Sequence, residues 1–116
     1  MIIRVLHVGL GPIGAAVARQ LVARSAFRIV GAVDIDPTKT GRDAGDVAEL
    51  GRALRVEVSA DIRKAVKASK PDIAVLCTSS SLKRVMPQLE ELLKLRVPVV
   101  STTEELAYPA PANRRL

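Results

Sequence analysis

Residues 2–14 read IIRVLHVGLGPIG, an aliphatic run that passes directly into three glycines spaced G-x-G-x-x-G. The spacing alone is weak, but here it follows a predicted strand and opens a predicted helix, as a dinucleotide fingerprint requires. Gly9 suits a tight turn, Gly11 lets the backbone approach a pyrophosphate, and Gly14 permits close packing of helix on strand. Pro12 fits the first helical turn, where its missing N–H needs no partner. The stretch therefore predicts a strand–turn–helix unit whose helix N-terminus faces a pyrophosphate.

A second strand is predicted at residues 28–34, and Asp34 ends it twenty residues after Gly14. An acid at this position accepts hydrogen bonds from the adenosine ribose and repels a 2′-phosphate, so Asp34 favours NAD over NADP. Lys39 and Arg42 follow in a loop that could turn onto a 2′-phosphate, although a solvated loop is the preferred interpretation of both. The bland alternative is that the glycines only make a turn and Asp34 is a solvated strand end, which fits the combined context less well.

The rest of the chain alternates between strand-like and helical hydrophobic periods. Further strands are predicted at residues 54–58, 72–78 and 98–102, and helices at residues 12–24, 43–50, 62–69 and 82–93. Ser59 is the expected cap of the third helix, and Pro87 either kinks the fourth or begins it. Thr102 and Glu105 have capping-box spacing for another helix. We therefore expect a Rossmann-type doubly wound α/β fold with a parallel sheet of about five strands, order 3-2-1-4-5, and helices on both faces.

Two hydroxyl-rich loops follow the fourth and fifth predicted strands. They consist of Thr78, Ser79 and Ser80, and of Ser101, Thr102 and Thr103. Ligands of open parallel sheets bind at the carboxyl ends of the strands, and this topology brings both loops beside the glycine turn. We expect them to border the nicotinamide and its ribose, with helix capping as an equally good and compatible interpretation. Glu104, Glu105 and Tyr108 could face a substrate amine from the same edge, although first-turn acids also suit a helix dipole.

No catalytic residue and no metal site is predicted within the chain. His7 is the single histidine, and a packed, hydrogen-bonded role inside the first strand is a better interpretation than acid–base chemistry. Cys77 is the single cysteine, which excludes an intramolecular disulfide, and it is interpreted as a small core residue of an aliphatic strand.

Composition narrows the class of protein further. The net charge is +6, but the basic residues are scattered and aromatic residues make up only 2% of the chain. Base stacking on aromatic side chains is therefore not expected, which argues against nucleic acid as a partner. The positive net charge is instead explained by the attraction of an anionic, phosphate-bearing ligand. The chain has no leader-like N-terminus and no apolar segment of the roughly 18 residues that span a bilayer, so we expect a cytoplasmic protein without a membrane partner.

With these residues in view, the sequence resembles the N-terminal half of the dihydrodipicolinate reductase-like oxidoreductases, and in particular the 2,4-diaminopentanoate dehydrogenases. The resemblance is carried by residues 8–14 (VGLGPIG), 31–37 (GAVDIDP), 77–81 (CTSSS) and 99–109 (VVSTTEELAYP). It implies NAD(P)-linked chemistry, either reduction of a ring C=N bond or oxidative deamination of an amino acid. By matching position, the residues that would bind the adenine half are Gly9, Gly11, Pro12, Ile13, Gly14 and Asp34. Thr78, Ser79 and residues 101–103 would approach the nicotinamide.

One departure from the family pattern bears on the substrate. Residues 101–103 read STT where dihydrodipicolinate reductases have Gly-Thr-Thr-Gly, which favours the amine dehydrogenase branch. Family members continue into a second α/β domain, so the resemblance implies an amino-acid-like substrate and a homo-oligomer for the full-length parent. Residues 1–108 would then be the dinucleotide-binding domain and residues 109–116 the truncated start of the next one, with the fragment inactive alone. Two alternatives stay open: a stand-alone nucleotide-binding or redox-sensing module acting through a partner protein, and a CoA- or S-adenosylmethionine-binding fold.

Overall fold

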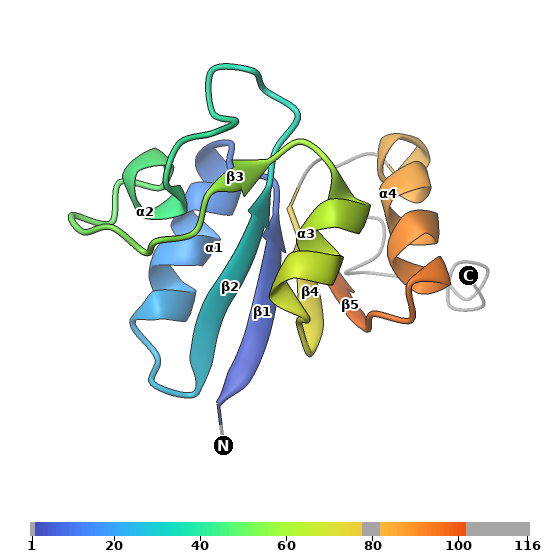
Figure 1. Cartoon of the computed structure of the whole chain (residues 1–116), viewed down its shortest axis with the longest axis horizontal. Helices are drawn as coiled ribbons and strands as arrows, with labels where there is room; N and C mark the ends of the chain where they lie inside the picture. The colour runs from blue at the N-terminus through green and yellow to red at the C-terminus, as the bar shows by residue number, and fades with distance from the viewer. Residues whose placement is uncertain (1, 78–81, 102–116) are drawn as a thin grey trace.

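The chain forms one parallel sheet with helices on both faces. The computed structural model describes residues 2–77 and 82–101, without the side chains of residues 82–85. Within those ranges the elements are β1 (Ile3–Val8), α1 (Pro12–Val22), β2 (Phe27–Val33), α2 (Ala44–Val47), β3 (Val58–Ser59), α3 (Ile62–Ser69), β4 (Ile73–Leu76), α4 (Leu82–Lys94) and β5 (Val99–Ser101) (Figure 1). Every strand pairing is parallel, in the order β3-β2-β1-β4-β5. The predicted strand order 3-2-1-4-5 is confirmed.

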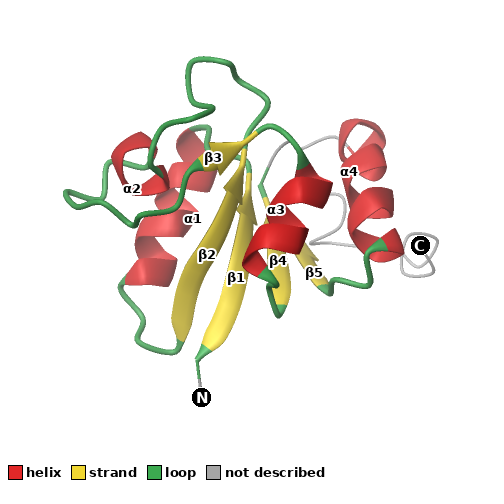
Figure 2. Cartoon of the chain, in the orientation of Figure 1, coloured by secondary structure: helices red, strands yellow, loops and turns green. Residues whose placement is uncertain are grey.

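The core consists of two aliphatic clusters, one on each face of the sheet. Figure 2 shows the helices that cover these faces. Beneath α1 and α2 the cluster is rich in alanine, including Ala15, Ala18 and Ala44, which lets these helices lie close to the strands. Beneath α3 and α4 it contains larger side chains such as Leu76 and Leu92. The central strands are covered on both faces, which explains why their sequences are aliphatic without alternation.

The third strand is the element that the sequence located least accurately. Residues 54–58 were expected to form it, but β3 consists only of Val58 and Ser59. Arg55 has a φ of 61°, which interrupts an extended conformation. The N–H groups of Leu54 and Val56 donate to the carboxylate of Asp43 at 2.8 and 2.9 Å. The segment before β3 is therefore held by the partly buried carboxylate of Asp43 rather than by a neighbouring strand.

The helices differ from expectation mainly at their ends. Asp61, not Ser59, caps α3, because its Oδ1 accepts a hydrogen bond from the Lys64 N–H at 3.2 Å. The second helix is shorter than predicted and ends at Val47. The fourth begins at Leu82 and contains Pro87, so Pro87 does not begin it. The helix expected after residue 102 lies outside the described residues, and none of the described helices is long and apolar enough to cross a membrane.

Candidate dinucleotide site at the carboxyl edge of the sheet

The turn between β1 and α1 depends on two glycines for its shape. Gly9 has a φ of 100°, a backbone conformation that favours glycine, and its N–H donates to the Val33 carbonyl at 2.8 Å. A Cβ atom on Gly14 would overlap the carbonyl group of Gly9, and it would lie 3.4 Å from the Cβ of Cys77. The absence of side chains at Gly9 and Gly14 therefore allows α1 to start directly against the end of the strand.

Gly11 has a different environment from these two glycines. It is the N-cap of α1, with φ −69° and ψ −173°, and a Cβ atom placed there would have no described neighbour within 4 Å. The helix N-terminus has no side-chain cap and no acid in its first turn, and Pro12 occupies an early position where no N–H is needed. Backbone N–H groups at such a terminus bind phosphate oxygens. The space above Gly11 therefore fits a pyrophosphate.

Asp34 lies at the end of β2 and reaches across to the glycine turn. Its Oδ2 accepts a hydrogen bond from the Leu10 N–H at 2.7 Å, and its Oδ1 accepts one from the Asp36 N–H at 2.9 Å. Only 12% of the side chain is exposed. A carboxylate offers about four acceptor positions, so two backbone bonds leave capacity for the hydroxyl groups of a ribose.

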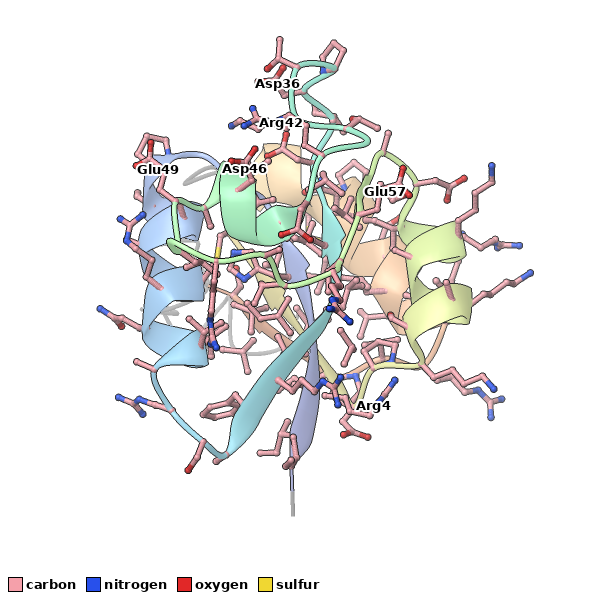
Figure 3. The ribbon with its side chains drawn as sticks, turned by 60° about the vertical axis from the view of Figure 1, so that its left-hand side comes forward. Arg4, Asp36, Arg42, Asp46, Glu49 and Glu57 are labelled. Atoms are coloured by element: carbon pink, nitrogen blue, oxygen red, sulfur yellow. The ribbon has the colours of Figure 1, made fainter. Side chains whose placement is uncertain are left out.

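Lys39 joins this site, contrary to the interpretation of residue 39 as a solvated loop residue. Its Nζ donates to the Leu10 carbonyl at 3.0 Å and lies 3.9 Å from Oδ2 of Asp34. Arg42 instead extends to Asp46, with 3.1 Å between Nε and Oδ2, and half of its side chain is exposed, as predicted. Figure 3 shows Asp36 at the top of this loop and Arg42 beside Asp46.

A cavity of about 260 Å³ opens at the glycine turn. Its wall is formed by the glycine turn, the loop after β2, the residue that follows β4, and α4. The lining residues include Gly9, Gly11, Asp34, Lys39, Cys77 and Gln88. Cys77 is only partly buried and borders this cavity, so its interpretation as a core residue is wrong. Sequence reasoning missed Gln88, because only the packing of α4 brings it to the turn. It also missed Ile35, a cavity-lining apolar side chain next to Asp34 that is 77% exposed.

Two further cavities differ in their relation to the turn. One of about 410 Å³ adjoins it on the outer side, between α1 and α2, and shares Gly11 and Lys39 with the first. The other, of about 430 Å³, lies between α3 and the β2–β3 edge, with Gly31 and Ser69 in its wall. Its wall includes neither the glycine turn nor Asp34, so we do not assign the dinucleotide to it.

His7 lies beneath the turn and is fully buried. Its Nε2 is 2.8 Å from the Gly14 carbonyl oxygen, which can only accept, so Nε2 carries the proton. Burial lowers the pKa of His7 below its ordinary value of 6.5, although the carbonyl groups of Gly14 and Gly9 act in the opposite direction. His7 is therefore a neutral, packed residue that ties β1 to α1, as the sequence predicted.

The hydroxyl-rich loops are described only in part. Ser101 ends β5 opposite Leu76, and its Oγ donates to the Leu76 carbonyl at 3.4 Å. This places Ser101 at the carboxyl edge of the sheet. Thr78, Ser79, Ser80, Thr102 and Thr103 lie outside the described residues, as do Glu104, Glu105, Tyr108 and residues 109–116. Their predicted roles stay predictions.

Comparison with known proteins agrees with this geometry. Residues 3–106 match the family described as dihydrodipicolinate reductase, N-terminus. An amine dehydrogenase of Streptomyces virginiae is 36% identical over 75 residues, which are 65% of this chain and 21% of that protein. A 2,4-diaminopentanoate dehydrogenase of Acetoanaerobium sticklandii is 28% identical over 108 residues, 92% of this chain and 30% of that protein.

Solved structures give the same result. An amine dehydrogenase from Mycobacterium smegmatis superposes with a TM-score of 0.85 at 37% identity, covering 92% of this chain and 31% of that one. A dihydrodipicolinate reductase from Paenisporosarcina sp. TG-14 has a TM-score of 0.61 at 22% identity over 87% of this chain and 37% of that one, which shows a shared fold. The chain thus spans between about a fifth and a third of the length of the curated relatives it matches. It belongs to the family of dihydrodipicolinate reductase N-terminal domains and is an NAD(P)-binding domain of these oxidoreductases.

Proposed function

We propose that the glycine turn holds the pyrophosphate of NAD(P) and that Asp34 binds the adenosine ribose. The observation that carries this proposal is the open space above Gly11, beside an α1 terminus that has no side-chain cap. Asp34 borders the same cavity and is held in place by two backbone N–H groups. In dinucleotide-binding folds of this type the pyrophosphate lies at the helix N-terminus and the acid at the end of the second strand binds the ribose, which supports the assignment.

NAD is the slightly preferred form of the cofactor in this proposal. A carboxylate at the end of β2 accepts hydrogen bonds from ribose hydroxyl groups and repels a 2′-phosphate. The adenosine end would then lie beside Asp34 and Ile35, and the nicotinamide end would lie toward β4 and β5. Residues 78–80 and 101–103 would border the nicotinamide, as the sequence predicts. When bound, the cofactor supplies the hydride acceptor or donor, and this chain positions it.

The parent reaction that we propose is the oxidative deamination of a small amine or amino acid. Identity is 36–37% to two amine dehydrogenases, but 22% to the dihydrodipicolinate reductase from Paenisporosarcina. The residues STT at 101–103 favour the same branch. We further propose that the residues for substrate binding, proton transfer and oligomer contacts lie in parts of the enzyme outside the matched region.

Calorimetric titration of the 116-residue chain with NADH, NADPH, CoA and S-adenosylmethionine tests the assignment. Saturable binding of NADH or NADPH is expected, and Gly11→Val should abolish it while leaving the circular dichroism spectrum unchanged. Tight binding of CoA or S-adenosylmethionine without dinucleotide binding would contradict the proposal. Dinucleotide affinity that survives Gly11→Val would place the ligand somewhere other than the glycine turn.

A further inference from the structure

The cavity between α3 and the β2–β3 edge lies apart from the proposed dinucleotide site. Its volume is about 430 Å³, which is larger than the cavity of about 260 Å³ at the glycine turn. The residues of α3 in its wall include Ala65, Ala68 and Ser69, which are too small to fill the space between the helix and the sheet edge. Cavities of this volume hold small molecules in many proteins.

The hydroxyl groups in the wall of this cavity already donate to the protein. Thr40 Oγ1 and Ser69 Oγ each donate to the backbone carbonyl four residues earlier, at 3.2 and 2.6 Å. Ser59 Oγ donates to the Asp61 carbonyl at 3.3 Å. The wall thus offers a ligand few neutral donors, which argues against a sugar or another neutral polyol.

Two cationic side chains also line the cavity. Arg55 and Lys64 are exposed, and their charged groups form no hydrogen bond or ion pair with another described residue. The backbone of Arg55 has a φ of 61°, and both of its neighbours donate their N–H groups to the Asp43 carboxylate, which fixes this conformation. Glu57 is the one acid among the described lining residues, so the wall carries one net positive charge.

We propose that this cavity binds a small organic carboxylate, with its charged group at Arg55 and Lys64 and its aliphatic part against the alanines of α3. A carboxylate accepts charge-assisted hydrogen bonds from guanidinium and ammonium groups. The remaining wall is mostly glycine, alanine and valine, so an anion with an aliphatic body gains more from burial than a bare, strongly hydrated one. The carboxylate binds independently of the dinucleotide, because the two cavities share no lining residue.

NMR titration of the chain with hexanoate, followed at the backbone amide signals, tests this assignment. Hexanoate should shift the signals of Gly31, Ala65 and Ala68 saturably, with a dissociation constant on the order of millimolar for so small a ligand. Hexanamide lacks the charge and acetate lacks most of the aliphatic part, so each should bind at least about fivefold more weakly. Addition of NADH should leave the hexanoate shifts in place.

Variants of the two cations, with a matched control, test which groups bind the carboxylate. Lys64→Met and Arg55→Asn should each weaken hexanoate binding by about fivefold or more, because one charge-assisted hydrogen bond is lost. Asparagine tolerates the positive φ of residue 55, so Arg55→Asn removes the charge without adding strain. Lys67 is exposed on the same helix outside the cavity wall, so Lys67→Met should match the wild type. Thermal melts identify any variant that fails to fold.

Several outcomes would overturn the carboxylate site. They are the absence of saturable shifts, equal binding of hexanamide, unchanged binding in both cavity variants, and equal weakening in Lys67→Met, which would assign the effect to net charge. Shifts confined to Gly9 and Gly11 and lost on addition of NADH would place the carboxylate at the glycine turn, and would overturn it as well. Saturable hexanoate shifts at Gly31 in a chain that binds no dinucleotide would contradict the dinucleotide site alone.

Discussion

The carboxylate of Asp34 accepts a hydrogen bond from the backbone N–H of Leu10, with 2.7 Å between Oδ2 and the nitrogen. This bond joins the end of β2 to the centre of the glycine motif. The same side chain therefore shapes the turn and faces the position proposed for the ribose. Binding and stability experiments on Asp34 must separate these two roles.

Replacement of Asp34 should change cofactor preference as well as stability. Asp34→Ala leaves the Leu10 and Asp36 N–H groups without their acceptors, at a cost of about 2 kcal/mol in the free energy of unfolding. Asp34→Ala should weaken the binding of NADH more than the binding of NADPH. Both cofactors lose an acceptor for the ribose, but NADPH is also released from the repulsion between the carboxylate and its 2′-phosphate. Asp34→Asn keeps one acceptor oxygen and should lose less stability with a similar change in preference. Titrations beside chemical denaturation measure both, and equal loss for the two dinucleotides would contradict the ribose assignment.

The same added methyl group should have opposite consequences at two glycines of the turn. Gly11→Ala should change stability by less than about 1 kcal/mol, because its Cβ has open space and its φ is −69°. It should still weaken dinucleotide binding, because the methyl group lies where the pyrophosphate approaches. Gly14→Ala should cost about 3 kcal/mol, since its Cβ overlaps the Gly9 carbonyl and the gain in helix propensity is only about 1 kcal/mol. Denaturation midpoints that fall equally in both variants would contradict this division of roles.

The turn and the sheet order could be predicted because their signals are local. The glycine spacing, Pro12 and Asp34 lie within one strand–helix–strand unit, and the aliphatic runs identify the buried strands without knowledge of their neighbours. The predicted packing of His7 followed from the same logic, since a residue within a covered strand has little access to a substrate.

The remaining features depend on contacts between residues distant in the sequence. The place of β3 depends on Asp43, whose carboxylate binds the backbone eleven and thirteen residues later. Lys39 reaches Leu10, twenty-nine residues earlier, because of the turn that precedes it. Gln88 and Cys77 come to the cavity through the packing of α4 and the length of β4. No hydrophobic periodicity or motif in the sequence indicates that these distant residues are in contact.

Asp43 should be among the most sensitive surface positions of the chain. Its two carboxylate oxygens accept from the N–H groups of Gly45, Leu54 and Val56, at 2.8, 2.8 and 2.9 Å. Asp43→Ala leaves these donors unsatisfied and should cost about 3 kcal/mol. Asp46→Ala, which removes only the exposed pair with Arg42, should cost less than about 1 kcal/mol and is the matched control. Similar values from urea denaturation would show that the loop before β3 does not depend on Asp43.

The pH dependence of the same bonds has a definite sign. Burial acts to raise the pKa of Asp43, but the backbone N–H donors of Leu54, Val56 and Gly45 outweigh it and hold that pKa below its ordinary value of 3.8. The stabilisation is thus fully present above pH 3.8 and is lost as the pH falls through the lowered pKa. Asp43→Asn should be less stable than the wild type at pH 6, and the difference should shrink in stronger acid. A difference that is constant down to pH 2 would contradict the role of the charge.

His7 should control the stability of the domain between pH 7 and pH 5. It is the single histidine of the chain, and burial lowers its pKa below 6.5, so the unfolded chain binds a proton that the folded chain excludes. Stability should therefore fall as the pH drops below about 6.5, with a slope of at most about 1.4 kcal/mol per pH unit for one proton. His7→Gln retains an amide that can donate to the Gly14 carbonyl but does not titrate. Urea denaturation across this range should show the slope in the wild type and not in the variant. The slope is expected from His7, because it is the only side chain whose ordinary pKa lies in that interval. Equal slopes in both proteins would instead assign the pH dependence to other groups.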